Sequence, residues 1–97
     1  MKYALLSDIH SNLEAFQMVI KDLEYEEVDH VCFLGDIVGY GADPAQCIDI
    51  LQGLTSWIVA GNHDWGAVEL TDTSYFSAPA KKAIDWTAKQ ISPSHRE

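Results

Sequence analysis

"Leu6-Ser7-Asp8-Ile9-His10-Ser11-Asn12" is the stretch on which the fold of this chain depends, because two metal-ligand side chains stand there where an apolar strand ends and a helix begins. Two later segments repeat this arrangement. Gly35-Asp36 follows the apolar run 31–34, and Gly61-Asn62-His63-Asp64 follows the apolar run 57–60. About 25 residues separate one segment from the next. The recurrence indicates three strand-to-loop junctions, each presenting side chains that can bind a cation.

The three apolar runs predict short strands over residues 2–6, 31–34 and 57–60. Each run is apolar at consecutive positions, which is typical of strands buried on both faces of a parallel sheet. Ser11 is the predicted N-cap of the first helix, and Glu14 completes a capping box. Apolar residues then recur at helical spacing through about Glu24.

Two further helices are predicted. Asp43 followed by Pro44 indicates a helix start, and this second helix is expected to stop at Gly53. A less patterned segment leads to a third helix over 77–91, which Ser92-Pro93 should end. The order strand, helix, strand, helix, strand, helix predicts an α/β fold. We expect a βαβαβα parallel sheet with right-handed crossovers and helices on its faces, in one domain over residues 1–97.

In a parallel sheet the carboxyl ends of all strands lie at one edge, so the three loops should open onto one crevice. Asp8, His10, Asp36, Asn62 and His63 would therefore meet there. Each motif alone has a simpler explanation. Asp-x-His can be a helix-capping aspartate beside a surface histidine, Gly-Asp is common in turns, and Gly-Asn-His-Asp can be a polar turn. All three in this order, at the ends of consecutive buried strands, favour a metal site.

The composition limits the class of protein. The chain has 97 residues, 47% of them hydrophobic, which is enough for one domain with a modest core. The net charge of -9, from 15 acidic and 6 basic residues, argues against a basic nucleic-acid-binding face. Two cysteines are too few for a disulfide framework. The N-terminus reaches Asp8 before a signal-peptide core could form, and no apolar run is as long as a membrane span. We therefore expect a cytoplasmic protein with no membrane partner.

The three motifs resemble those of the calcineurin-like metallophosphoesterase family, whose order is Asp-x-His, then Gly-Asp, then Gly-Asn-His-Asp or Gly-Asn-His-Glu. The resemblance covers nearly the whole chain and implies the N-terminal half of that family's α/β sandwich. It implies that Asp8 and His10 bind a first ion, that Asp36 bridges two ions, and that Asn62 binds the second. It also implies that His63 contacts the phosphate and assists the leaving group.

The resemblance implies metal-dependent hydrolysis of a phosphoester bond. Two divalent ions about 4 Å apart would hold a hydroxide nucleophile and clamp the phosphoryl oxygens for in-line attack. Ligation by histidine and carboxylate together suits Mn, Fe, Zn, Co or Ni better than Mg or Ca. The candidate substrate-binding residues are Asn62, His63 and Tyr40.

Two departures from the family pattern refine this interpretation. In the protein-phosphatase branch the second motif continues as Gly-Asp-x-x-Asp-Arg-Gly, where this chain has Gly39 and Tyr40. The chain resembles instead the smaller bacterial and archaeal phosphoesterases that act on phosphodiesters or nucleotide-like phosphates. Family members also supply three later histidines, which neither His30 nor His95 matches. We therefore expect half of a domain that binds at most one ion tightly and hydrolyses weakly. The alternative is a non-catalytic metal-binding scaffold or interaction domain of the same fold.

A half-sheet has an unpaired edge strand and an uncovered apolar face. Any single aromatic residue is best explained as part of the core. Their density in the second half of the chain nevertheless suggests that some face strands outside this chain, namely Trp57, Trp65, Tyr75, Phe76 and Trp86. The expected partners are a phosphoester small molecule and a second copy of the chain, which would form a homo-oligomer through the exposed sheet edge.

Overall fold

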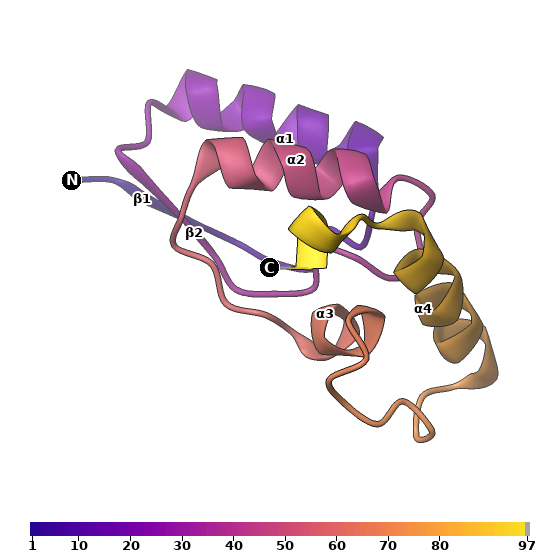
Figure 1. The fold of residues 1–97 in the computed structure, drawn as a ribbon. Helices are drawn as coiled ribbons and strands as arrows, with labels where there is room; N and C mark the ends of the chain where they lie inside the picture. The colour runs from indigo at the N-terminus through magenta and orange to yellow at the C-terminus, as the bar shows by residue number, and fades with distance from the viewer. Residues whose placement is uncertain (97) are drawn as a thin grey trace.

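The computed structural model describes residues 1–96 (Figure 1); the last residue of the predicted domain lies outside this range. In chain order the elements are β1 (Tyr3–Leu6), α1 (Leu13–Glu26), β2 (His30–Phe33), α2 (Pro44–Leu54), α3 (Asn62–Ala67), α4 (Ala78–Gln90) and the 3-10 helix η1 (Pro93–Arg96). The predicted α/β class is confirmed. The predicted sheet is larger than the one that these residues form.

Strands β1 and β2 form a two-stranded parallel sheet, with Tyr3 opposite His30 and Leu6 opposite Phe33. The prediction of a third strand over 57–60 is wrong for the described residues, because only an isolated parallel bridge joins Ile58 to Phe33. The NH of Phe33 donates to the carbonyl of residue 57 at 2.8 Å, and its carbonyl accepts from the NH of residue 59 at 2.9 Å. The ladder ends after this one residue pair, and α3 begins soon after it at Asn62.

Helix α1 begins one residue later than predicted. Asn12 is the N-cap, and its side-chain oxygen accepts a hydrogen bond from the NH of Ala15 at 3.1 Å. The predicted cap, Ser11, is buried with φ +59°, and its NH donates to the carbonyl of Ile37 at 2.8 Å. The reason for the shift is tertiary, because Ser11 belongs to a loop that pairs with the second loop before the helix can start.

The later helices follow the sequence signals closely. Asp43 is the N-cap of α2 with Pro44 in its first turn, and the helix passes Gly53 by one residue. Ser77 caps α4 by accepting from the NH of Ala80 at 3.4 Å. Helix α3 was not predicted, because it has six residues and no apolar periodicity long enough to detect.

The described part of the chain covers only one face of the sheet. Helices α1 and α2 lie side by side over that face (Figure 1), and the core beneath them includes Phe16, Phe33, Cys47, Ile48 and Leu51. On the opposite face Tyr3 and Leu5 are 54% and 67% exposed. The His30 ring stacks between those of Tyr3 and Trp57, with centroids 5.2 and 4.9 Å away. Within residues 1–96 no helix combines the length and the hydropathy that crossing a bilayer requires.

Candidate metal centre

The loops after β1 and β2 continue side by side beyond the sheet. The NH of Asp8 donates to the carbonyl of Gly35 at 2.9 Å, and the NH of His10 donates to the carbonyl of Asp36 at 3.0 Å. Asp8, His10 and Asp36 all have left-handed backbones, with φ of +59°, +50° and +60°. Such a conformation costs a residue other than glycine about 1–2 kcal/mol. The paired loops therefore hold three donor residues in a conformation that none of them would favour alone.

Asp8, His10 and Asp36 come together as the candidate metal-ligand group expected from the sequence. One ligand atom from each residue can be chosen so that all three atoms lie within 4.8 Å of one another. The Nδ1 of His10 lies 2.9 Å from the carbonyl oxygen of Val38, so Nδ1 must donate to it. The Nε2 of the same ring lies 3.2 Å from Oδ1 of Asp8. Two lone pairs would face each other there unless a proton or a metal cation lies between them.

The carboxylate of Asp8 is kept charged by its neighbour. The hydroxyl of Ser7 donates to Oδ2 of Asp8, and this bond is the main reason that the pKa of Asp8 is below its usual value. The side chain of Asp8 is 62% exposed, so the pair His10–Asp8 is open to solvent on that side. An anionic oxygen at an open position is suited to binding a divalent cation.

Asp36 lies against the start of α3. Its Oδ1 accepts a hydrogen bond from the NH of His63 at 2.9 Å. A Cβ on Gly61 would collide with the Asp36 carboxylate, so only glycine permits this approach. Asn62 follows Gly61 directly as the exposed first residue of α3. The third motif therefore does meet the second, and the contact brings the Asn62-His63 segment beside the ligand group.

His63 is buried under three aromatic rings. Its ring centroid lies 4.8 Å from that of His10, 4.8 Å from that of Tyr40 and 5.0 Å from that of Phe76, and the residue is 7% exposed. Burial, and next the neighbouring His10 ring, lower the pKa of His63. The imidazole is therefore mostly neutral at pH 7.

The Nδ1 atom of His63 is buried and has no hydrogen-bond partner within the described part of the chain. It faces Gly39, where a Cβ would collide with the imidazole. Gly39 stands where the protein-phosphatase motif has an aspartate, and the structure leaves no room for that side chain in this chain. The space that such a side chain would need is filled by the His63 ring itself.

Asp64 is a residue of the site whose role the sequence interpretation missed. Its carboxylate accepts from the NH groups of Asp36 at 2.6 Å, Gly61 at 2.8 Å and Val38 at 3.2 Å. Burial raises the pKa of Asp64, and the three hydrogen bonds oppose that rise. One carboxylate thus ties the second loop to the third. The available signal was the Gly61-x-x-Asp64 spacing, in which an acidic residue at the third helical position bonds back to the N-cap NH.

The other two histidines lie away from the ligand group, as expected. His30 begins β2, so it lies at the opposite end of the strand from Asp36. His95 belongs to η1, where its Nε2 lies 2.7 Å from Oδ1 of Asp49 and its Nδ1 accepts from the NH of Ser92. Both rings are accounted for by structural contacts.

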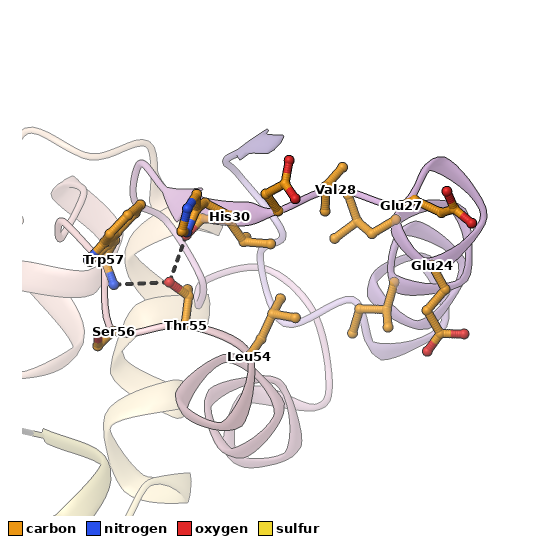
Figure 2. A pocket seen from close by; sticks show the side chains of 12 residues that line it. Glu24, Glu27, Val28, His30, Leu54, Thr55, Ser56 and Trp57 are labelled. Carbon is orange, nitrogen blue, oxygen red and sulfur yellow. Dashed lines mark hydrogen bonds between the residues drawn. The ribbon is translucent and has the colours of Figure 1, made fainter. Parts of the chain in front are cut away.

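A hollow of about 710 Å³ lies at the far end of the sheet from the ligand group (Figure 2). Figure 2 shows Glu24 and Glu27 on one side of it and His30 and Trp57 on the other. Thr55 also lines the hollow. Its hydroxyl donates to the carbonyl of Val31 at 2.7 Å and accepts from the NH of Trp57 at 3.0 Å. This hollow is lined at the amino ends of the strands, whereas the ligand group lies at their carboxyl ends.

Comparison with known proteins agrees with this geometry. Residues 1–91 match the sequence profile of the calcineurin-like phosphoesterases. An uncharacterized protein of Methanocaldococcus jannaschii is 43% identical over 88 residues, which are 91% of this chain and 36% of that protein. The crystal structure of a metallophosphoesterase from Sphaerobacter thermophilus superposes with a TM-score of 0.80 at 36% identity, covering 99% of this chain and 39% of the other. This chain thus spans less than two fifths of either relative. The chain belongs to the calcineurin-like phosphoesterase family, whose members are hydrolases.

Proposed function

We propose that this chain carries the first metal site and the phosphate-contacting histidine of a metal-dependent phosphoester hydrolase acting on phosphodiesters or nucleotide-like phosphates. The observation that supports this most directly is the group Asp8, His10 and Asp36, whose ligand atoms lie within 4.8 Å of one another. The donor set of two carboxylates and one imidazole nitrogen fits a divalent transition metal. Mn, Fe, Zn, Co and Ni are the candidates.

Each residue of the site would have its own role in the proposed hydrolysis. Asp8, His10 and Asp36 would hold the cation, and the Val38 carbonyl fixes the His10 tautomer so that Nε2 can be a ligand. A divalent cation there would supply positive charge for the phosphoryl oxygens and would increase the acidity of an attacking water. Neutral His63, beside the His10 ring, can offer an N–H to the phosphate or to the leaving oxygen. The side-chain oxygen of Asn62 would provide an uncharged ligand, next to Asp36, for a second metal ion.

We predict that the isolated chain binds one divalent ion tightly and hydrolyses phosphodiesters weakly. The first ion has three protein ligands, but the second has only Asp36 and Asn62, which is fewer than catalytic metal sites use. Elemental analysis after dialysis against Mn²⁺ should find one ion per chain, and bis(4-nitrophenyl) phosphate should be turned over slowly. Two retained ions with rapid turnover would contradict the prediction. One ion that raises the melting temperature without any turnover would favour the scaffold function.

We also propose that the chain self-associates through the open side of its sheet. Tyr3, Leu5 and Trp57 are each at least half exposed there, and within residues 1–96 β1 pairs with β2 alone. An apolar face beside an unpaired edge favours association. Light scattering at micromolar concentration should give a dimer or larger species. Leu5→Lys should shift this species towards the monomer, while Met18→Lys, on exposed α1 surface, should not. A monomer in the unmodified chain would exclude the proposal.

A further inference from the structure

A second hollow, of about 500 Å³, lies beside the ligand group. Asp8 and His10 line it, together with Tyr40 from the second loop and the acidic residues Glu14 and Asp43. A substrate whose phosphate approached the metal ligands would place one of its substituents in this hollow. The residues that line it should therefore influence which substituents are accepted.

Tyr40 is held in this hollow by its backbone. It has φ +63° and lies at the centre of a three-residue turn, because the NH of Gly41 donates to the carbonyl of Gly39 at 2.8 Å. The same NH lies 3.0 Å from the carbonyl of His10, which ties the turn to the first loop. A Cβ on Gly41 would collide with that carbonyl. These hydrogen bonds from Gly41 thus hold Tyr40 in a backbone conformation that is unfavourable for a residue other than glycine.

The ring of Tyr40 is both supported and accessible. It packs on His63 with centroids 4.8 Å apart and an interplanar angle of 41°, and it meets His10 edge-on at 5.1 Å and 71°. The residue is nevertheless 58% exposed. An aromatic ring that is fixed on one side and open on the other can stack on a flat group at little cost in side-chain entropy.

The charge around Tyr40 restricts the anion that fits. Three acidic residues line the hollow, namely Asp8, Glu14 and Asp43, and no lysine or arginine is among the described residues that line it. A phosphate bound at the adjacent ligand group would lie close to these charges, so a second negative charge on it would meet repulsion. A phosphodiester carries one charge, whereas a phosphomonoester carries close to two at neutral pH. The hollow therefore favours the diester.

We propose that Tyr40 is a specificity-determining residue, which stacks on a flat aromatic substituent of a singly charged phosphodiester whose phosphate lies at Asp8, His10 and Asp36. This rests on the proposed function, because the phosphate is placed by the metal site. The shared chemistry is a planar aromatic group attached through a phosphodiester, and it includes aryl esters and nucleosides. Stacking on one aromatic side chain should increase affinity about tenfold.

The test is calorimetric titration of the Zn²⁺-loaded chain with diphenyl phosphate, dicyclohexyl phosphate and phenyl phosphate. The first two have the same charge and similar apolar size but differ in flatness. Diphenyl phosphate should bind about tenfold more tightly than dicyclohexyl phosphate, and phenyl phosphate should bind more weakly than diphenyl phosphate. Tyr40→Phe should keep the preference for the flat diester. Tyr40→Leu should reduce it to within about twofold, with an unchanged affinity for dicyclohexyl phosphate.

Each contrary result has its own meaning. A preference for the flat diester that survives Tyr40→Leu would overturn the role of Tyr40 and leave the proposed function standing. Equal weakening of both diesters by Tyr40→Leu would also overturn it, because the residue would then support the site as a whole. Tighter binding of phenyl phosphate than of diphenyl phosphate would overturn the charge argument. If Zn²⁺ binds and none of the three phosphates does, the proposed function fails as well.

Discussion

Asp36→Asn should lower the affinity of the chain for Mn²⁺ by at least about 100-fold, since even the residues that only orient metal ligands change affinity by about 10- to 100-fold when mutated. Asparagine keeps a side-chain oxygen that can accept the 2.9 Å hydrogen bond from the NH of His63. Its amide nitrogen then takes the place of Oδ2, so the negative charge is lost and a donor replaces an acceptor. The substitution therefore removes the metal site while keeping the contact that seats α3.

Calorimetric titration with Mn²⁺ checks this prediction, with Asp22→Asn as the matched control. Asp22 lies on α1 far from the site, so the control loses one carboxylate without touching a ligand. The control should bind Mn²⁺ as the unmodified chain does. The metal-free melting temperatures of all three proteins should be similar. Unchanged Mn²⁺ binding by Asp36→Asn would show that the cation does not lie at Asp8, His10 and Asp36.

Asp64→Ala should lower the free energy of unfolding by about 3–5 kcal/mol, because each buried donor left without a partner costs about 1–3 kcal/mol. The carboxylate accepts from three backbone NH groups, those of Asp36, Val38 and Gly61. Alanine satisfies none of them, and water reaches them only in part. The loss should also loosen the second loop from the third and so weaken metal binding.

Urea unfolding of the metal-free chain measures this effect directly. Asp64→Asn should fall between the unmodified chain and Asp64→Ala, because an amide oxygen can still accept but carries no charge. Asp22→Ala, on the exposed surface of α1, should change the unfolding free energy by less than about 0.5 kcal/mol. Equal stability of Asp64→Ala and Asp22→Ala would mean that the three hydrogen bonds contribute nothing net.

Local signals predicted α1, α2 and α4 but not the short helix α3. Asp43-Pro44 and Ser77 marked the starts of α2 and α4 correctly, because capping and proline geometry act within one turn. The start of α1 was missed by one residue. Ser11 and Asn12 are both good capping residues, and the choice between them was made by the pairing of Ser11 with Ile37, which lies far away in the sequence.

The candidate metal ligands could also be predicted from the sequence, whereas the hydrogen bonds that hold their loops in place could not. Asp8, His10 and Asp36 each follow an apolar run, and parallel strands bring such positions together. Nothing local to Asp64 reveals that its carboxylate reaches the NH groups of Asp36 and Val38. The prediction of a third strand over 57–60 was wrong for a similar reason. Whether an apolar run becomes a strand depends on the backbone hydrogen bonds that it makes with distant segments, and here only one bridge forms.

The order of apolar runs and polar loops by itself determined the α/β class, the positions of α1, α2 and α4, and the identity of the candidate cation-binding side chains, because these depend on residue type and short-range spacing. Only the tertiary structure decided that residues 1–96 form a sheet of two strands with one open face, and that Asp64 joins the loops. The tertiary structure likewise decided the left-handed backbone conformations of Asp8, His10 and Asp36. Each of these features depends on hydrogen bonds between segments distant in the chain, whose energy no local pattern contains.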